Sequence, residues 1–182
     1  TRFAFLNIMT LQSTKFWDFS NQLYGKDGVA EICLDLQDKL EVDVNLLLFC
    51  YWIACFKNTP SESEWMQISQ FSKSWNMNVI QPLRNARKSI TAKLESHPAN
   101  SAYAELREQV KSNELAAEKI QQETIQSLLE LTAEETQSFS TEEALENLSL
   151  YFSELNITQT VGIKKSLLTI AEKACLLYTS DA

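Results

Sequence analysis

Three basic side chains on one helical face are the residues of this chain best suited to bind a ligand. Arg84, Arg87 and Lys88 follow one another at spacings of three and four, which places them together on a helix. Arginine presents a planar fork of N–H donors that fits a carboxylate or a phosphate. The alternative is that they form ion pairs with acids of neighbouring helices, namely Asp18, Asp38 and Asp43. We favour ion pairing, and keep open an anionic small ligand or an acidic partner segment.

Residues for the common catalytic mechanisms are scarce. His97 is the only histidine and precedes Pro98 in an expected turn, which argues against Ser–His–Asp, Cys–His and multi-histidine metal sites. The three glycines form neither GxGxxG nor GxxxxGK. Glu31, Asp35 and Asp38 have helical spacing and could hold Mg²⁺ with a diphosphate, but we read them as a solvated face. We therefore expect no catalytic residue, no metal site and no cofactor.

Aromatic and amide side chains complete the candidate site. Four tryptophans indicate a large aromatic core or an apolar surface for a partner. Trp17 lies at the edge of an apolar stripe, whereas Trp52 is expected in the core. Asn45 is surrounded by apolar residues, and we predict a polar contact from it to Arg84 or Asp18. The candidate binding residues are Trp17, Asp18, Asp38, Asn45, Trp75, Arg84 and Arg87.

Helices must position these residues, because the chain is poor in turn formers. Its 182 residues include only 3 Gly and 3 Pro, and no segment shows the alternation of a strand. The fold class is therefore predicted to be all-α, a helical bundle. The net charge of −8 opposes the phosphate backbone of nucleic acid, so no nucleic-acid binding is expected.

Residues 44–56 form the apolar centre of the predicted bundle. Asp43 is suited to cap this helix, with Val42 and Leu47 as a hydrophobic staple. Thirteen residues would span about 20 Å, against ~30 Å of hydrocarbon in a bilayer. A membrane span is therefore not predicted, and a helix that is apolar all round indicates a buried central helix.

A long antiparallel hairpin is predicted from residues 62–95 and 101–132. Ser61 and Glu64 have the spacing of a capping box, and an apolar stripe runs from Trp65 past Pro82 to Leu94, which favours a kink over a break. A turn at residues 96–101 leads to a second stripe of nearly heptad spacing. That stripe is Tyr103, Leu106, Val110, Asn113, Ala117, Ile120, Thr124, Leu128 and Leu131.

The chain divides into three stretches by composition. Residues 1–12 are expected to be a poorly ordered leader without an export signal, in which residues 1–8 precede a possible start at Met9. Residues 13–96 form a helical core, and residues 101–178 form an acidic helical half that could pack on the same core. Four cysteines within apolar helical patterns indicate reduced thiols and a cytoplasmic location.

The first half also resembles a known family. The run "FWDFSNQLYGKDGVAEICLDLQDKLEVDVNLLLFCYW", then Trp75 and "VIQPLRNARKSI", is similar to a bacterial domain-of-unknown-function family, number 2390, over residues 16–94. The resemblance implies a small cytoplasmic protein of proteobacteria and no established activity. The resemblance implies more arginine after the Pro-Leu-Arg element than this chain has, where the basic residues are Arg84, Arg87 and Lys88.

These observations favour a non-enzymatic cytoplasmic binding or regulatory protein. A groove near Trp17, Trp75, Arg84 and Arg87 would hold a segment of a protein partner, and self-association is a further option. The alternative is an enzyme or carrier for an anionic, partly apolar small molecule inside the bundle. It predicts a deep pocket in which Arg84 is buried with Asp18 or Asp38, whereas the binding protein predicts a shallow groove.

Overall fold

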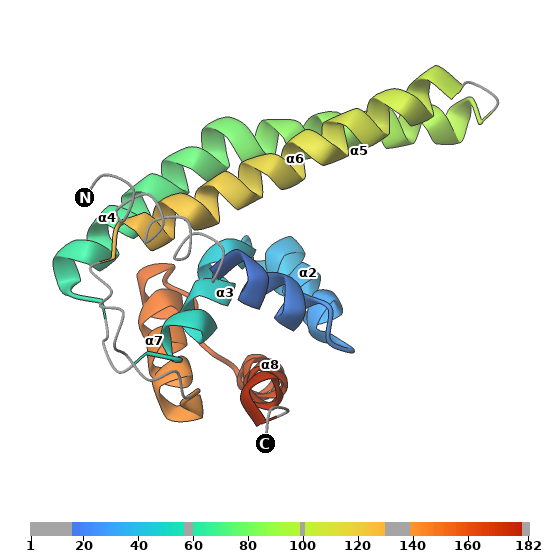
Figure 1. Cartoon of the computed structure of the whole chain (residues 1–182). Coiled ribbons are helices and arrows are strands. Elements are labelled where there is room, and N and C mark those ends of the chain that lie inside the picture. Colours follow the sequence, from blue (N-terminus) through green and yellow to red (C-terminus); the bar gives the residue numbers. More distant parts are fainter. Residues whose placement is uncertain (1–15, 57–59, 99–100, 130–138, 180–182) are drawn as a thin grey trace.

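The protein is all-α, as predicted. The structure is a computed structural model that describes residues 16–56, 60–98, 101–129 and 139–179, and these contain helices and short connections but no strand (Figure 1). A helix over residues 16–24 precedes α2 (Val29–Leu40) and α3 (Val44–Ile53). The second half ends with α7 (Thr141–Glu154) and α8 (Val161–Thr179).

A long helical hairpin lies above this group of helices and projects beyond it (Figure 1). One arm is α4 (Glu62–Trp75), the π-helical segment η1 (Asn76–Ile80) and α5 (Gln81–Ser96), and the other is α6 (Ser101–Ser127). The predicted hairpin is therefore confirmed. No residue of α5 is buried, and the buried residues of α6 all lie from Glu114 onward, so the outer part of the hairpin is a two-helix arm in solvent.

The predicted central helix is confirmed and is α3. Asp43 caps it by accepting a hydrogen bond from the backbone N–H of Asn45, and every residue from Asn45 to Phe56 is buried. Around it, Phe16 stacks on Trp52 at 5.0 Å between ring centroids, and the Tyr51 hydroxyl donates to the carbonyl of Leu167 at 2.8 Å. No helix in the described part of the chain is long and apolar enough to cross a membrane.

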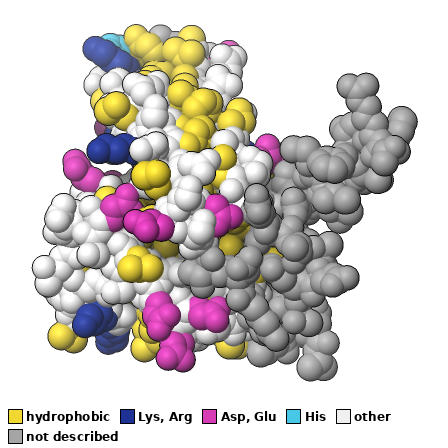
Figure 2. Space-filling model, turned by 90° about the vertical axis from the view of Figure 1, so that its left-hand side faces the viewer, with side chains coloured by type: hydrophobic (Ala, Val, Ile, Leu, Met, Phe, Trp, Pro, Cys, Tyr) yellow, Lys and Arg dark blue, Asp and Glu magenta, His cyan; other side chains and the backbone are white. Residues whose placement is uncertain are grey.

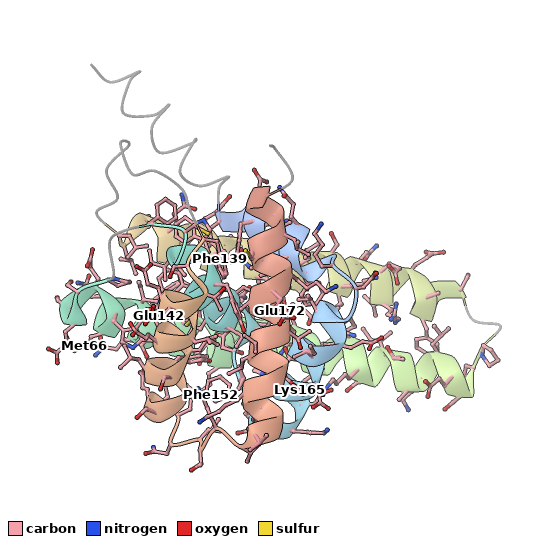
Figure 3. The ribbon with its side chains drawn as sticks, turned by 90° about the horizontal axis from the view of Figure 1, so that it is seen from below. Met66, Phe139, Glu142, Phe152, Lys165 and Glu172 are labelled. Atoms are coloured by element: carbon pink, nitrogen blue, oxygen red, sulfur yellow. The ribbon has the colours of Figure 1, made fainter. Side chains whose placement is uncertain are left out.

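One hydrophobic core contains residues from both halves of the chain. It includes Phe16, Phe49, Phe152 and Ala174, and thus joins the first helix and α3 to α7 and α8. Seen from below, α7 and α8 lie side by side under this core (Figure 3). On the face shown in Figure 2, hydrophobic side chains gather over the hairpin at the top, while acidic side chains are spread below them.

Local signals explain how the first arm of the hairpin begins and continues. Ser61 and Glu64 form the predicted capping box, since each side chain bonds to the other residue's backbone N–H. The region in which a kink was favoured is the π-helical turn η1, which leads into α5 with Pro82 near its start. Because proline has no N–H to donate, the wider π turn lets the helix continue past it without a break.

The predicted stripe of the second arm is partly wrong. Leu106, Asn113 and Ile120 are exposed, although heptad spacing placed them in the seam. The buried residues of α6 are Glu114, Ala117, Gln121, Gln122, Ile125 and Gln126. Four of these six are polar, and they are buried because their side chains are hydrogen-bonded to other parts of the chain.

Candidate functional site

A groove of about 520 Å³ lies between the first helix, α3 and the two arms of the hairpin. We call it the central groove. Its apolar lining includes Trp17, Tyr24, Leu48 and Leu115, and its polar lining includes Asn45, Arg84, Arg87 and Gln122. Such a combination of apolar surface with a few polar groups is typical of ligand sites.

The central groove brings together four of the seven predicted site residues, namely Trp17, Asn45, Arg84 and Arg87. Asp18 is exposed and is not part of its lining. Trp75 packs inside the hairpin, where its indole N–H donates to the carbonyl of Ala117 at 2.9 Å and its ring stacks on Phe71.

Asp38, the seventh predicted residue, lines a different cavity, which we call the polar hollow. This hollow has a volume of about 610 Å³ and also includes Asp43, Asn76, Lys88 and Tyr151. Arg84 lines both cavities. The polar hollow and the central groove therefore have this arginine in common.

Arg84 and Arg87 form ion pairs, but with other partners than those predicted. Arg84 Nε donates to Glu114 Oε1 at 3.0 Å, and Arg87 Nε donates to Glu114 Oε2 at 2.5 Å. A second bond runs from Arg84 Nη2 to Glu118 Oε1 at 3.1 Å. The expected pairing with Asp18, Asp38 or Asp43 is wrong, because the opposite arm of the hairpin places two glutamates one helical turn apart beside the arginines.

Burial and pairing act in opposite directions on these carboxylates. Burial disfavours the Glu114 carboxylate, but hydrogen bonds and charges from Arg87 and Arg84 prevail and lower its pKa. Burial prevails at Glu118 and raises its pKa despite the nearby Arg84. Hydrogen bonding to Glu114 also raises the pKa of Arg87. Both arginines therefore already have carboxylate partners.

Asn45 is buried, with 8% of its surface exposed, and its contacts differ from the prediction. Its Nδ2 donates to Gln121 Oε1 at 2.7 Å, and its Oδ1 accepts from Gln122 Nε2 at 2.7 Å. The expected contact to Arg84 or Asp18 is wrong, because the NH₂ group and the oxygen of the Asn45 amide are hydrogen-bonded to two glutamines of α6 instead. Asn45 therefore ties the central helix to the hairpin.

Asp43 continues this set of hydrogen bonds. Gln121 Nε2 donates to Asp43 Oδ2 at 2.8 Å, while the backbone N–H of Asn45 donates to Oδ1 at 2.9 Å. Burial raises the pKa of Asp43, and hydrogen bonds from Gln121 and Asn76 act against that increase. The Tyr151 hydroxyl accepts from the backbone N–H of Asp43 at 3.0 Å. Helices α3, α6 and α7 thus meet at the cap of α3.

Two buried polar atoms of the central groove's lining have no hydrogen-bond partner among the described residues. They are Ser20 Oγ and Gln122 Oε1, in side chains that are each only 3% exposed. An unpaired polar atom in the interior costs about 1–3 kcal/mol, so such atoms indicate an absent water or ligand. Neither Ser20 nor Gln122 is among the site residues predicted from the sequence, where the only signal was their polarity beside apolar residues.

A third cavity, of about 470 Å³, is mostly apolar and is lined by Ile53, Trp65, Leu150 and Glu154 among others. Two of these lining residues are hydrogen-bonded to each other: the Trp65 indole N–H donates to Glu154 Oε2 at 2.8 Å. Over the described ranges, no group of three or more His, Cys, Asp or Glu residues is placed to hold a metal ion.

Comparison with protein-family models identifies the family of this chain. The model of DUF2390, a family of proteins of unknown function, matches residues 15–125 of the 182, and the chain belongs to this family. The match extends beyond the first half into α6 and contains every residue named above for the central groove. No curated protein and no solved structure matches the chain.

Proposed function

We propose that this protein is a non-enzymatic binding protein whose central groove holds a segment of a partner protein. The observation that carries the proposal is the pair of unpartnered atoms, Ser20 Oγ and Gln122 Oε1, in the lining of a groove that also has apolar walls. A protein segment supplies both an apolar side chain for Trp17 and Leu48 and backbone groups for unpartnered polar atoms.

The charges of the groove favour this function over an enzyme or carrier for an anionic molecule. Arg84 and Arg87 donate to Glu114 and Glu118, so an anion would have to compete with two carboxylates of the chain itself. The alternative also called for Asp18 or Asp38 beside Arg84, and neither forms an ion pair with it among the described residues. An uncharged segment avoids this competition.

The thiols support a cytoplasmic location for this function. Cys33 and Cys50 are buried and have free thiols, Cys55 is buried in the turn at the C-terminal end of α3, and Cys175 is partly buried with a free thiol. Free thiols in the core persist most readily in a reducing compartment.

Site-specific photocrosslinking in the cells that make this protein tests the proposal. A benzophenone amino acid at Leu115, on the rim of the groove, is compared with the same amino acid at Leu176 of α8. The two leucines are matched, because each is 53% exposed. We expect a discrete protein adduct from position 115 that is weak or missing from position 176, with the crosslinked peptide of the partner identified by mass spectrometry.

Three results would refute the proposal or redirect it. Equal crosslinking from both positions would mean that the groove is not the contact surface. A small molecule retained in a native mass spectrum, with no protein adduct at position 115, would favour the carrier. A crosslinked peptide from a second copy of this chain would identify the partner as the protein itself, and light scattering would then show a doubled mass.

A further inference from the structure

A directed chain of amide side chains runs from the cap of α3 to the central groove. Gln121 donates to Asp43 Oδ2, Asn45 donates to Gln121 Oε1, and Gln122 donates to Asn45 Oδ1, at 2.8, 2.7 and 2.7 Å. The chain ends at Gln122 Oε1, which has no partner among the described residues. Asp43 lines the polar hollow and Gln122 lines the central groove, so the chain connects the two cavities.

The acceptor at the start of this chain determines the orientation of every amide in it. An amide has a donor NH₂ and an acceptor oxygen, whereas a carboxylate only accepts. Because Asp43 accepts from Gln121, the oxygen of Gln121 must face Asn45, which must therefore donate. By the same step the oxygen of Asn45 faces Gln122. The atom at the end of the chain that has no hydrogen-bond partner among the described residues is therefore an acceptor, Gln122 Oε1.

We propose that the central groove selects an uncharged N–H donor, the amide of a protein segment that carries an apolar side chain, through Gln122 Oε1 at the end of the chain set by Asp43. This inference rests on the function proposed above and names the chemistry of the ligand. The oxygen is buried, so this proposal requires the side chains over it to move aside when the segment binds. The hydroxyl of Ser20 can donate to the carbonyl of the same segment.

The surrounding charges agree with an uncharged ligand. The groove is lined by the cations Arg84, Arg87 and Lys111 and by the anions Glu108, Glu114 and Glu118, so its formal charge is balanced. Glu114 accepts from both arginines. A carboxylate placed against Gln122 Oε1 would bring two acceptors together, with no arginine freed to compensate.

A pair of small probes tests this selectivity in the intact protein. 4-Methylpentanamide has an apolar chain and an uncharged carboxamide, and 4-methylpentanoate has a carboxylate in the same place and no N–H donor. Titrations followed by nuclear magnetic resonance shifts of Trp17 and Gln122 give the two affinities. We expect the amide to bind at least about tenfold more tightly, the effect of one hydrogen bond gained against one lost.

The substitution Asp43→Asn tests the role of the chain from outside the groove. Asparagine caps a helix as well as aspartate does, so α3 keeps its cap through the oxygen of the new side chain. Its NH₂ then faces Gln121, and each amide must turn over until Gln122 presents NH₂ to the groove. We expect the preference for 4-methylpentanamide to fall by about tenfold, and the nuclear Overhauser contacts of the Gln122 NH₂ protons with Asn45 to disappear.

Matched substitutions within α6 separate recognition from folding. Gln122→Met and Gln126→Met each remove one buried amide, but only Gln122 lines the groove. We expect only Gln122→Met to abolish the preference. Equal or tighter binding of 4-methylpentanoate, no binding of either probe, or an unchanged preference in Asp43→Asn would overturn the inference. A protein adduct at position 115 alongside any of these results would leave the proposed function standing and reject only this ligand chemistry.

Discussion

Glu114 joins the two arms of the hairpin, and Glu114→Gln measures how much this pairing stabilises the fold. Its side chain is 8% exposed and accepts from both Arg84 and Arg87. Removing one member of a buried ion pair costs about 3–5 kcal/mol because a charge is left without a partner. Here Arg87 is 25% exposed and Arg84 retains Glu118, so both charges are partly compensated. We therefore expect a loss of about 2–3 kcal/mol.

Urea unfolding followed by circular dichroism gives this value, with Glu118→Gln as the matched control on the same helix. Glu118 is 27% exposed and accepts one bond from Arg84, so its replacement should cost about 1 kcal/mol or less. Burial also raises the pKa of Glu118, which means that the folded protein disfavours the ionised form of this carboxyl group. A loss for Glu114→Gln no larger than that for Glu118→Gln would refute the view that Glu114 is the centre of the network.

The pH dependence of the same variant provides an independent test. The pKa of Glu114 is lower in the folded protein than its ordinary value of 4.5, so the folded state holds its proton less tightly than the unfolded state. Its contribution to stability is therefore complete above pH 4.5 and is lost as the pH falls through the folded pKa. The difference between wild type and Glu114→Gln should narrow in acid, and a difference that stays constant from neutral pH downward would contradict the assignment.

Three further predictions concern other parts of the fold. Asn45→Leu leaves a donor and an acceptor of α6 without partners and should lower the free energy of unfolding by about 2–4 kcal/mol in urea. A thiol reagent at neutral pH should label Cys175 in the native protein and all four cysteines only after unfolding, because the other three are buried and burial raises the pKa of Cys33 to about 12. Ser61→Ala removes the capping box with Glu64 and should cost about 1 kcal/mol in the same urea assay, with no change in probe binding at the groove.

Signals that lie within a few residues of one another were sufficient to predict much of this fold. Asp43 before an apolar run predicted both the cap and the burial of α3, and Ser61 with Glu64 predicted the start of α4. These predictions succeeded because a cap bonds to N–H groups two or three residues away, so sequence spacing already fixes the geometry. The hairpin followed in the same way, from the turn between its two apolar stripes.

Contacts between distant segments could not be predicted in this way. Arg84 was recognised as a residue in need of a partner, but the choice of Glu114 over Asp38 depends on how α5 and α6 are aligned. Leu106 and Ile120 fit a heptad seam but are exposed. The prediction failed here because it assigned the buried face of α6 from apolar character alone. A polar residue can occupy a buried position when its partner is also buried, and the partner lies some 76 residues away in the case of Asn45 and Gln121.

The buried polar face of α6 is more than a device for holding the hairpin together. Well-packed apolar side chains in place of a buried ionic network are often neutral or stabilising, so Glu114, Gln121 and Gln122 are not what stability alone would favour. Register could be fixed by a single buried polar contact, as in coiled coils. Yet here the contacts form a continuous path from Asp43 to Gln122, and one end of it has an acceptor with no partner among the described residues. Because the acceptor without a partner belongs to a side chain in the lining of a groove, a ligand that completes the path explains it better than folding does.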